Sequence, residues 1–192
     1  MRRIVVVESL TLDGVMQAPG RPDEDRRGGF DHGGWAQPYS DAVMAGEMGK
    51  GMGRTELLFG RRTYENLYSY WPHQKDNPFT EVLNNTRKYV ASTTLTEPLP
   101  WSNSTLLTGD AVDAVDALRR EPGNDIVILG SGEVVSALLR RGLVDEFQLL
   151  IHPLVLGSGR RLFPDGTPVA PLNLTNSVTT TTGVLIATYQ PV

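Results

Sequence analysis

The sequence predicts an α/β protein with a mixed, mainly parallel sheet and helices on both faces. Short apolar runs rich in β-branched residues alternate along the chain with segments of helical periodicity. Several of these runs end in a glycine turn, as strands do where a crossover helix begins. The last two strand-like stretches, residues 172–177 and 184–189, flank a threonine-rich turn. They predict a C-terminal antiparallel hairpin.

The remaining elements follow from periodicity and from capping residues. Strands are expected at 4–8, 56–59, 88–91, 104–107, 125–129 and 146–151. Helices are expected at 41–48, 62–68, 79–85, 110–120 and 133–141. Residues 11–34 are rich in Gly, Pro, Asp and Arg and predict a long irregular loop. Loops of this length in a compact domain often form binding sites.

Composition limits the class of protein. The chain has 192 residues, of which 40% are hydrophobic and 21% charged, so we expect a single domain over residues 1–192 with a full core. A net charge of -4 predicts no nucleic-acid partner and no membrane-surface partner. The absence of cysteine excludes disulfides, thiolate metal sites and a cysteine nucleophile. We expect a cytoplasmic location.

One glycine turn predicts a phosphate-binding site. Gly130, Ser131 and Gly132 follow the apolar run 126–129 and precede a helical pattern that begins with Glu133 and Val134. The N–H groups and the positive end of a helix can hold a phosphate there, and small residues let the backbone approach it closely. The alternative is a tight turn between strand and helix with no ligand.

Four segments resemble the dihydrofolate reductase-like superfamily. They are residues 4–14 (IVVVESLTLDG), 58–65 (LFGRRTYE), 89–95 (YVASTTL) and 128–163, which contains GLVDE and LGSGRRLF. More narrowly, the chain is similar to the reductase (C-terminal) domain of the bifunctional deaminase–reductase of riboflavin biosynthesis and to its stand-alone relatives. The resemblance implies a three-layer dihydrofolate reductase-like fold, the cofactor NADPH, and hydride transfer to a heterocyclic or otherwise conjugated small-molecule substrate.

The resemblance also implies cofactor-binding residues at two further strand ends. The hydroxyl of Thr63 can bind a phosphate, and the guanidinium groups of Arg61 and Arg62 can pair with the 2′-phosphate of NADPH. The full set of candidates at these strand ends is Gly60, Arg61, Arg62, Thr63, Ser92, Thr93 and Thr94. The alternatives are a solvated arginine pair and ordinary turn chemistry.

The first strand and its loop line the nicotinamide in the related reductases. By resemblance, Ser9 and residues 12–17 take this role, with Gln17 as a cofactor contact and Asp13 as a candidate substrate contact. The carboxamide would be held largely by backbone groups. The alternative for Asp13 is a simple turn with Gly14.

Aromatic residues and a second glycine turn are the candidates for substrate binding. Phe30, Trp35 and Tyr64 can stack on a ring, although such residues are more often part of a core. Leu156 and Gly157 begin a turn that can close the substrate pocket or bind an anion.

Two acids are candidates for the proton donor. Dihydrofolate reductases carry an acid shortly after a tryptophan, and Asp41 follows Trp35 by six residues. Asp41 fits the N-cap of a helix equally well. Glu8, in the first strand, is the second candidate. The three histidines have no ligand spacing, so we expect no metal site.

Two departures from the riboflavin reductases bear on the substrate. The "DPxLTxR"-like segment that supports ribose phosphate recognition is replaced by residues 64–85, and the zinc deaminase half is absent. We expect an NADPH-dependent reductase acting on 5-amino-6-(5-phosphoribosylamino)uracil or a related compound. The alternatives are dihydrofolate reductase activity and a nucleotide-binding protein without catalysis. A homodimer is expected from the resemblance alone.

Overall fold

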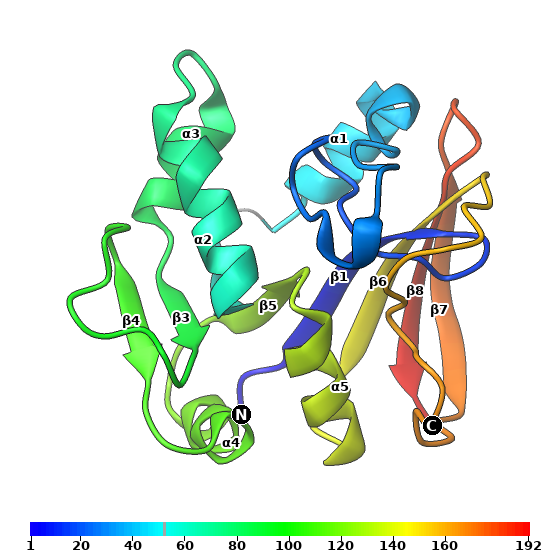
Figure 1. Cartoon of the computed structure of the whole chain (residues 1–192). Helices are drawn as coiled ribbons and strands as arrows, with labels where there is room; N and C mark the ends of the chain where they lie inside the picture. Colours follow the sequence, from blue (N-terminus) through cyan, green and yellow to red (C-terminus); the bar gives the residue numbers. More distant parts are fainter. Residues whose placement is uncertain (52) are drawn as a thin grey trace. The chain divides into compact units, whose positions relative to one another are not determined.

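The computed structural model describes residues 1–51 and 53–192 and contains, within them, eight strands and five α-helices (Figure 1). The strands are β1 (Ile4–Thr11), β2 (Thr55–Gly60), β3 (Lys88–Ala91), β4 (Ser104–Leu107), β5 (Asp125–Leu129), β6 (Glu146–His152), β7 (Leu172–Thr179) and β8 (Leu185–Pro191). The helices are α1 (Ala42–Gly49), α2 (Arg61–Tyr70), α3 (Pro78–Asn85), α4 (Ala111–Arg120) and α5 (Gly132–Arg140). Each described helix is too short or too polar to cross a membrane.

The chain divides into two compact units that interleave in the sequence. The first contains residues 1–5 and 51–143, and the second contains residues 6–50 and 144–192. Strand β1 begins in the first unit and continues in the second. The expected single domain over residues 1–192 stays a prediction, and each unit is described by itself below.

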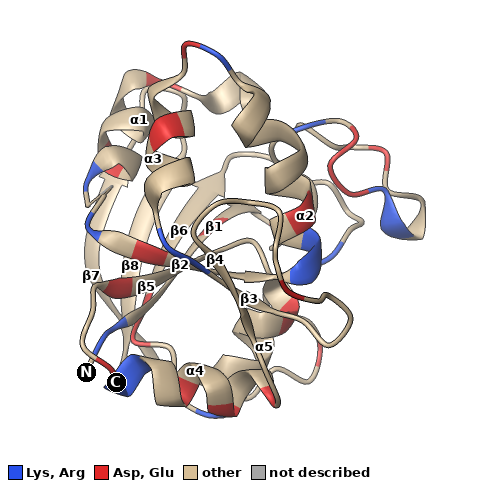
Figure 2. Ribbon diagram, turned by 90° about the vertical axis from the view of Figure 1, so that its left-hand side faces the viewer, with Lys and Arg blue, Asp and Glu red and all other residues tan. Residues whose placement is uncertain are grey.

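The first unit is a parallel sheet between two layers of helices. Its strands follow the order β4-β3-β2-β5, and each neighbouring pair is parallel. Helices α2 and α3 lie on one side of this sheet and α4 and α5 on the other (Figure 2). The backbone N–H of Ile126 in β5 donates to the carbonyl of Arg3, at the start of β1 (2.8 Å). The predicted mainly parallel sheet with helices on both faces is confirmed.

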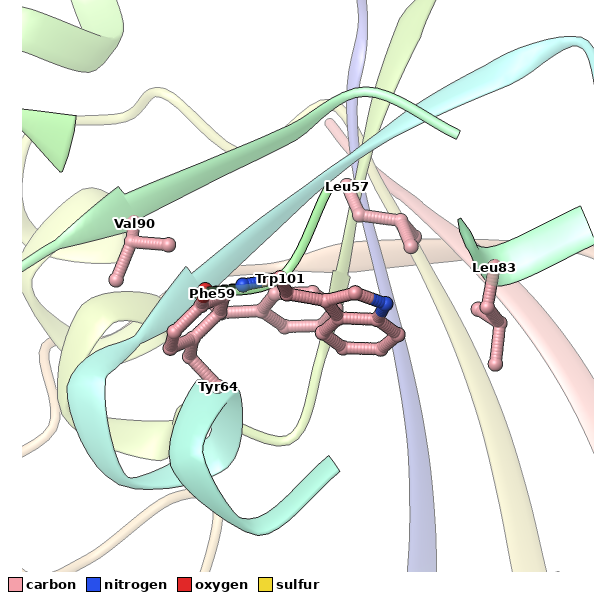
Figure 3. Close-up of a cluster of buried hydrophobic side chains, with 6 residues drawn as sticks. All are labelled: Leu57, Phe59, Tyr64, Leu83, Val90 and Trp101. Carbon is pink, nitrogen blue, oxygen red and sulfur yellow. Dashed lines mark hydrogen bonds between the residues drawn. The ribbon is translucent and has the colours of Figure 1, made fainter. Parts of the chain in front are cut away.

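One hydrophobic cluster fills the space between the sheet and helices α2 and α3 (Figure 3). Its six buried members are Leu57, Phe59, Tyr64, Leu83, Val90 and Trp101. The hydroxyl oxygen of Tyr64 accepts a hydrogen bond from the backbone N–H of Trp101 (2.9 Å), and the Tyr64 side chain is only 1% exposed. Tyr64 is therefore a core residue, which corrects its prediction as a stacking platform for the substrate.

Two buried cations in the first unit are fully engaged. Arg2 pairs with Glu56, and Glu56 also accepts a hydrogen bond from the hydroxyl of Tyr89 (2.8 Å). The amino group of Lys88 donates to the carbonyls of Thr86 (2.7 Å) and Ser102 (2.9 Å) and lies over the Trp101 ring. Burial lowers the pKa of Lys88 to about 8. The hydrogen bonds of Arg2 and Lys88 therefore link separate segments of the first unit through its interior.

The second unit is built on the strand order β1-β6-β8-β7. Strand β8 is antiparallel to both β6 and β7, so the predicted C-terminal hairpin is confirmed. The register between β7 and β8 shifts between Leu174 and Asn176, which marks a β-bulge. Strand β1 runs three residues beyond the predicted end, to Thr11, and its last two residues, Leu10 and Thr11, are both buried.

The long loop after β1 folds around a small core of its own. Val15, Ala18, Phe30 and Trp35 are buried against one another, and the indole N–H of Trp35 donates to the carbonyl of Gln17 (2.7 Å). Phe30 and Trp35 are only 6% and 7% exposed, which favours the core alternative for both rings. Phe30 also lines a small pocket beside the turn 158–160, so its role in substrate binding stays a prediction. The loop is irregular, as predicted.

Candidate cofactor site

Two strand-to-helix turns of the first unit lie against each other. Strands β2 and β5 are parallel neighbours, so their carboxyl ends meet at one edge of the sheet. The backbone N–H of Gly60 donates to Oγ of Ser131 (2.9 Å), and the backbone N–H of Ser131 donates to Oγ1 of Thr63 (3.1 Å). Each turn therefore supplies a hydroxyl that binds the backbone of the other.

The small residues of these turns are required by this close contact. A Cβ on Gly60 would lie 3.3 Å from Cγ2 of Val134, and a Cβ on Gly130 would lie 3.1 Å from the methyl and hydroxyl groups of Thr63. Gly130 (φ 59°) and Ser131 (φ 61°) both adopt the left-handed conformation. For the serine this costs on the order of 1–3 kcal/mol, which the surrounding hydrogen bonds must offset.

Two helices begin at these turns without a side-chain cap. Gly60 is the N-cap of α2 and Ser131 the N-cap of α5, and neither helix receives a hydrogen bond from its N-cap side chain. Ser131 instead directs its hydroxyl to Gly60 and to the carbonyl of Leu129 (3.2 Å). Main-chain donors in the first turns of two helices thus lie at the same sheet edge, where they favour an anion.

The predicted roles of the Gly60 and Ser131 N–H groups as donors to a phosphate do not fit this geometry. The N–H groups of Gly60 and Ser131 already have side-chain acceptors, so they bind the turns to each other and not a ligand. The N–H of Val134 donates to the carbonyl of Ser131 within the helix (2.8 Å). The candidate phosphate-binding groups are therefore the first residues of α2 and α5, which include Arg61, Arg62 and Gly132. Glu133 follows in α5 with an exposed side chain.

The arginine pair begins α2, where Figure 2 shows the blue start of the helix. Nη1 of Arg61 pairs with Oε2 of Glu65 (2.9 Å) one helical turn later, with side chains 37% and 46% exposed. An exposed pair of this kind is worth about 0.3–0.5 kcal/mol, so a phosphate can replace the carboxylate at little cost. The side chain of Arg62 is exposed at the helix start.

A third turn reaches the same edge of the sheet. Strand β3 is the parallel neighbour of β2, and the register places Ala91 opposite Gly60. Ser92 follows directly, and its Oγ accepts hydrogen bonds from the N–H groups of Thr94 and Leu95 (both 3.1 Å). Ser92 therefore shapes the turn, while the side chains of Thr93 and Thr94 are exposed.

Glu8 is a buried acid of the second unit. Its side chain is buried in β1, and its Oε1 has no hydrogen-bond partner within residues 1–51 and 53–192. Burial, together with the nearby charge of Glu24, raises the pKa of Glu8 well above its usual value. This shift favours the protonated, uncharged form of the carboxyl. Ser9, the next residue, is half-buried.

Asp41 is a structural acid. Its Oδ1 accepts the N–H of Met44 (2.7 Å) as the N-cap of α1, and its Oδ2 accepts the N–H (2.7 Å) and the hydroxyl (2.6 Å) of Thr181 in the β7–β8 turn. These hydrogen bonds, led by that from Met44, lower the pKa of Asp41, so it carries no proton to donate near neutral pH. The geometry corrects the catalytic prediction and favours the N-cap alternative.

The remaining predicted residues of the second unit meet through structural hydrogen bonds. Asp13 accepts the N–H groups of Leu156 (3.2 Å) and Gly157 (2.8 Å) and the hydroxyl of Thr11 (2.6 Å). The Thr11 hydroxyl is the main reason that the pKa of Asp13 is lowered. Gln17 is buried and uses its side-chain amide to bind neighbouring loops. Their predicted roles in cofactor and substrate binding stay predictions, and the structure shows that Asp13 and Gln17 bind loops to one another.

His152 is a buried residue with structural contacts. His152 is 1% exposed, its Nδ1 lies 2.9 Å from the carbonyl of Leu150, and its ring packs edge-on against Trp35. Across residues 1–51 and 53–192, no group of three or more His, Cys, Asp or Glu side chains is arranged to hold a metal ion.

Comparison with known proteins places the chain in a family. The family model described as the RibD C-terminal domain matches residues 2–186. The Bacillus subtilis (strain 168) protein YyaP is 31% identical over 195 residues, covering 98% of this chain and 95% of YyaP. A crystal structure of a pyrimidine reductase-like protein from Corynebacterium diphtheriae aligns with a TM-score of 0.68 at 16% identity, over 100% of this chain and 92% of the other.

A second solved structure, like the one from Corynebacterium diphtheriae, shows similarity of the fold alone. Dihydrofolate reductase from Enterococcus faecalis, complexed with NADP(H), aligns with a TM-score of 0.63 at 14% identity, over 98% of this chain and 96% of that enzyme. The predicted dihydrofolate reductase-like fold is confirmed. The chain therefore belongs to the RibD C-terminal domain family.

Proposed function

We propose that this protein is an NADPH-dependent reductase that transfers a hydride to a nitrogen heterocycle, such as 5-amino-6-(5-phosphoribosylamino)uracil. One observation carries the proposal: three strand ends, two uncapped helix starts and an arginine pair meet at one sheet edge of the first unit. Membership of the RibD C-terminal domain family supports it. So does the fold shared with a reductase that was crystallised with NADP(H).

The residues at this edge suit the phosphates of a dinucleotide. The first turns of α2 and α5 offer main-chain donors to the pyrophosphate. The Thr63 hydroxyl accepts the N–H of Ser131 and keeps its own proton to donate to a phosphate oxygen. Arg61 and Arg62, with the hydroxyls of Thr93 and Thr94, suit the 2′-phosphate. NADPH supplies the hydride when bound.

Glu8 is the residue that we assign to proton transfer. Burial raises its pKa well above the usual value, which favours the protonated form, and its Oε1 has no hydrogen-bond partner among the described residues. A group of this kind can give a proton to a substrate nitrogen as the hydride is added. Dihydrofolate reduction is the alternative activity, and Asp41 was its expected proton donor. The lowered pKa of Asp41 and its hydrogen bonds from Met44 and Thr181 do not suit that role.

Cofactor titration and turnover test the proposal. We expect the wild-type protein to bind NADPH, followed by Trp fluorescence, and to oxidise it when the aminouracil is added. Changing Arg61→Ala and Arg62→Ala together should weaken NADPH binding at least about tenfold, since charge-assisted hydrogen bonds are worth about 1.5–3 kcal/mol each. NADH binding should change little.

Arg120→Ala is the matched control for the arginine pair, because Arg120 forms an exposed pair with Asp116 at the end of α4. It should leave both affinities unchanged. Binding of NADPH without oxidation of any pyrimidine would leave the protein as a nucleotide-binding protein without catalysis, the second alternative. The expected homodimer and the cytoplasmic location stay predictions.

A further inference from the structure

Two aspartates of the second unit are each followed by a glycine. The pairs are Asp13 with Gly14 and Asp165 with Gly166. In such a pair the main-chain nitrogen of the glycine can attack Cγ of the aspartate, because the glycine has no side chain to block the approach. The sequence alone gives the two pairs the same reactivity. Their surroundings in the structure differ.

Hydrogen bonds hold the pair of Asp13 and Gly14 in place. Oδ1 of Asp13 accepts the hydroxyl of Thr11 (2.6 Å), and its Oδ2 accepts the N–H of Gly157 (2.8 Å). The N–H of Gly14 donates to the carbonyl of Thr11 (3.0 Å). The Thr11 hydroxyl is the main cause of the lowered pKa of Asp13, which favours the ionised form and leaves no hydroxyl to be lost. Both reacting groups of this pair are therefore occupied.

The pair of Asp165 and Gly166 is exposed in the loop that joins β6 to β7 (Figure 1). Within the described part of the chain, no hydrogen bond or ion pair holds the Asp165 carboxyl or the Gly166 N–H. Gly166 is left-handed (φ 82°), and a Cβ there would meet nothing within 4 Å. Thr167 closes the turn, since its N–H (3.0 Å) and its hydroxyl (2.6 Å) donate to the carbonyl of Pro164. An exposed turn of this kind opens at low cost, which lets the Asp165 backbone rotate.

We propose that Asp165 is a site of spontaneous covalent modification, at which the aspartate converts to isoaspartate through a succinimide. The nitrogen of Gly166 forms a bond to Cγ of Asp165, and the carboxyl hydroxyl leaves with the amide proton as water. A second water then breaks the bond between that nitrogen and the α-carbonyl carbon of Asp165. The main chain now runs through Cγ and the α-carboxylate is free. The mass is unchanged, so the conversion needs no oxidant, reductant or co-substrate.

The chain is anchored on both sides of this pair. Leu162 is buried (2% exposed), and its N–H donates to the carbonyl of Gly14 (3.2 Å). Strand β7 begins at Leu172 on the other side. Residues 164–171 lie between these anchors and are exposed, apart from half-buried Thr167. One additional main-chain carbon is therefore accommodated in this segment, and the modified protein keeps its sheet.

Peptide mapping of the full chain tests the proposal. The protein is incubated at mildly acidic pH and physiological temperature, and electron-transfer fragmentation then distinguishes isoaspartyl from aspartyl peptides. We expect at least about tenfold more isoaspartate at position 165 than at position 13, because the hydrogen bonds of Asp13 and Gly14 must first break. In urea this protection is lost, and the two positions should react at similar rates.

Two variants test whether a succinimide is the intermediate. Asp165→Glu would have to form a six-membered ring with Gly166, so modification at this position should disappear. Asp165→Asn forms the same succinimide with loss of ammonia, so it should react faster than the wild type at neutral pH. Absence of isoaspartate at position 165 overturns the proposal, and so do equal amounts at positions 13 and 165 in the folded chain. Thermal denaturation of the modified protein should match that of the unmodified protein.

Discussion

Two buried cations of the first unit and one buried carboxyl of the second differ in how far their polar atoms are hydrogen-bonded. In the first unit, the buried cations Arg2 and Lys88 are surrounded by acceptors from several elements. In the second unit, one oxygen of the buried Glu8 carboxyl has no hydrogen-bond partner among the described residues. A buried polar group whose hydrogen bonds are all made holds a fold in one arrangement, whereas an unpartnered polar atom can still bind another group. The comparison distinguishes groups that stabilise the fold from the carboxyl that we propose for proton transfer.

The largest expected effect comes from breaking a satisfied group. Glu56→Ala removes the partner of buried Arg2 and the acceptor of the Tyr89 hydroxyl. It should lower the free energy of unfolding by about 3–5 kcal/mol, because an uncompensated charge stays buried. Urea denaturation measures this. Asp116→Ala breaks the exposed pair with Arg120 and should cost no more than about 0.5 kcal/mol. Similar losses in the two variants would contradict the role given to the Arg2 network.

The next effect concerns Glu8 and depends on pH. The folded pKa lies above the usual value of about 4.3 that applies in the unfolded chain, so above this pH the unfolded chain binds fewer protons. Stability of the wild type should therefore fall as pH rises from about 4.3 towards the folded pKa. Glu8→Gln should remove this slope in unfolding experiments and should lower the rate of NADPH oxidation. A variant with unchanged slope and unchanged turnover would exclude Glu8 as a neutral, reactive carboxyl.

The smallest effect distinguishes the two acids of the second unit. Asp41→Ala removes the N-cap of α1 and the clamp on Thr181 of the β7–β8 turn. It should lower the melting temperature by a few degrees and leave turnover per folded molecule as in the wild type. Asp41→Asn keeps an acceptor for Met44 and should lose less. A loss of turnover at a temperature where Asp41→Ala is fully folded would restore its catalytic candidacy.

Most of the fold followed from the sequence, because strand and helix periodicities are local. The site followed only in part, since its contacts join distant residues. Ser131 and Gly60 are 71 positions apart, and only the register of β2 with β5 brings them together. The sequence showed that small residues were needed at these turns but not that a neighbouring turn, instead of a ligand, requires them.

The direction in which a side chain points was the other property that could not be predicted from the sequence. Phe30, Trp35 and Tyr64 have the residue type of stacking platforms, yet each points into a core. The N-cap role of Asp41 could be predicted because it depends on neighbouring residues. Its hydrogen bond to Thr181, 140 positions away, could not be predicted from the sequence. Gln17 was predicted from the family's cofactor contacts, and its actual bonds to Arg27 and Arg160 depend on how two loops meet.

The amino group of Lys88 has a practical consequence. It is sealed beneath the Trp101 ring and bound to carbonyls from two stretches of chain, so an amine-reactive reagent reaches it only when those stretches separate. Its labelling rate, followed by mass spectrometry against that of exposed Lys75, would therefore measure how often the segments around Thr86 and residues 101–102 separate under native conditions.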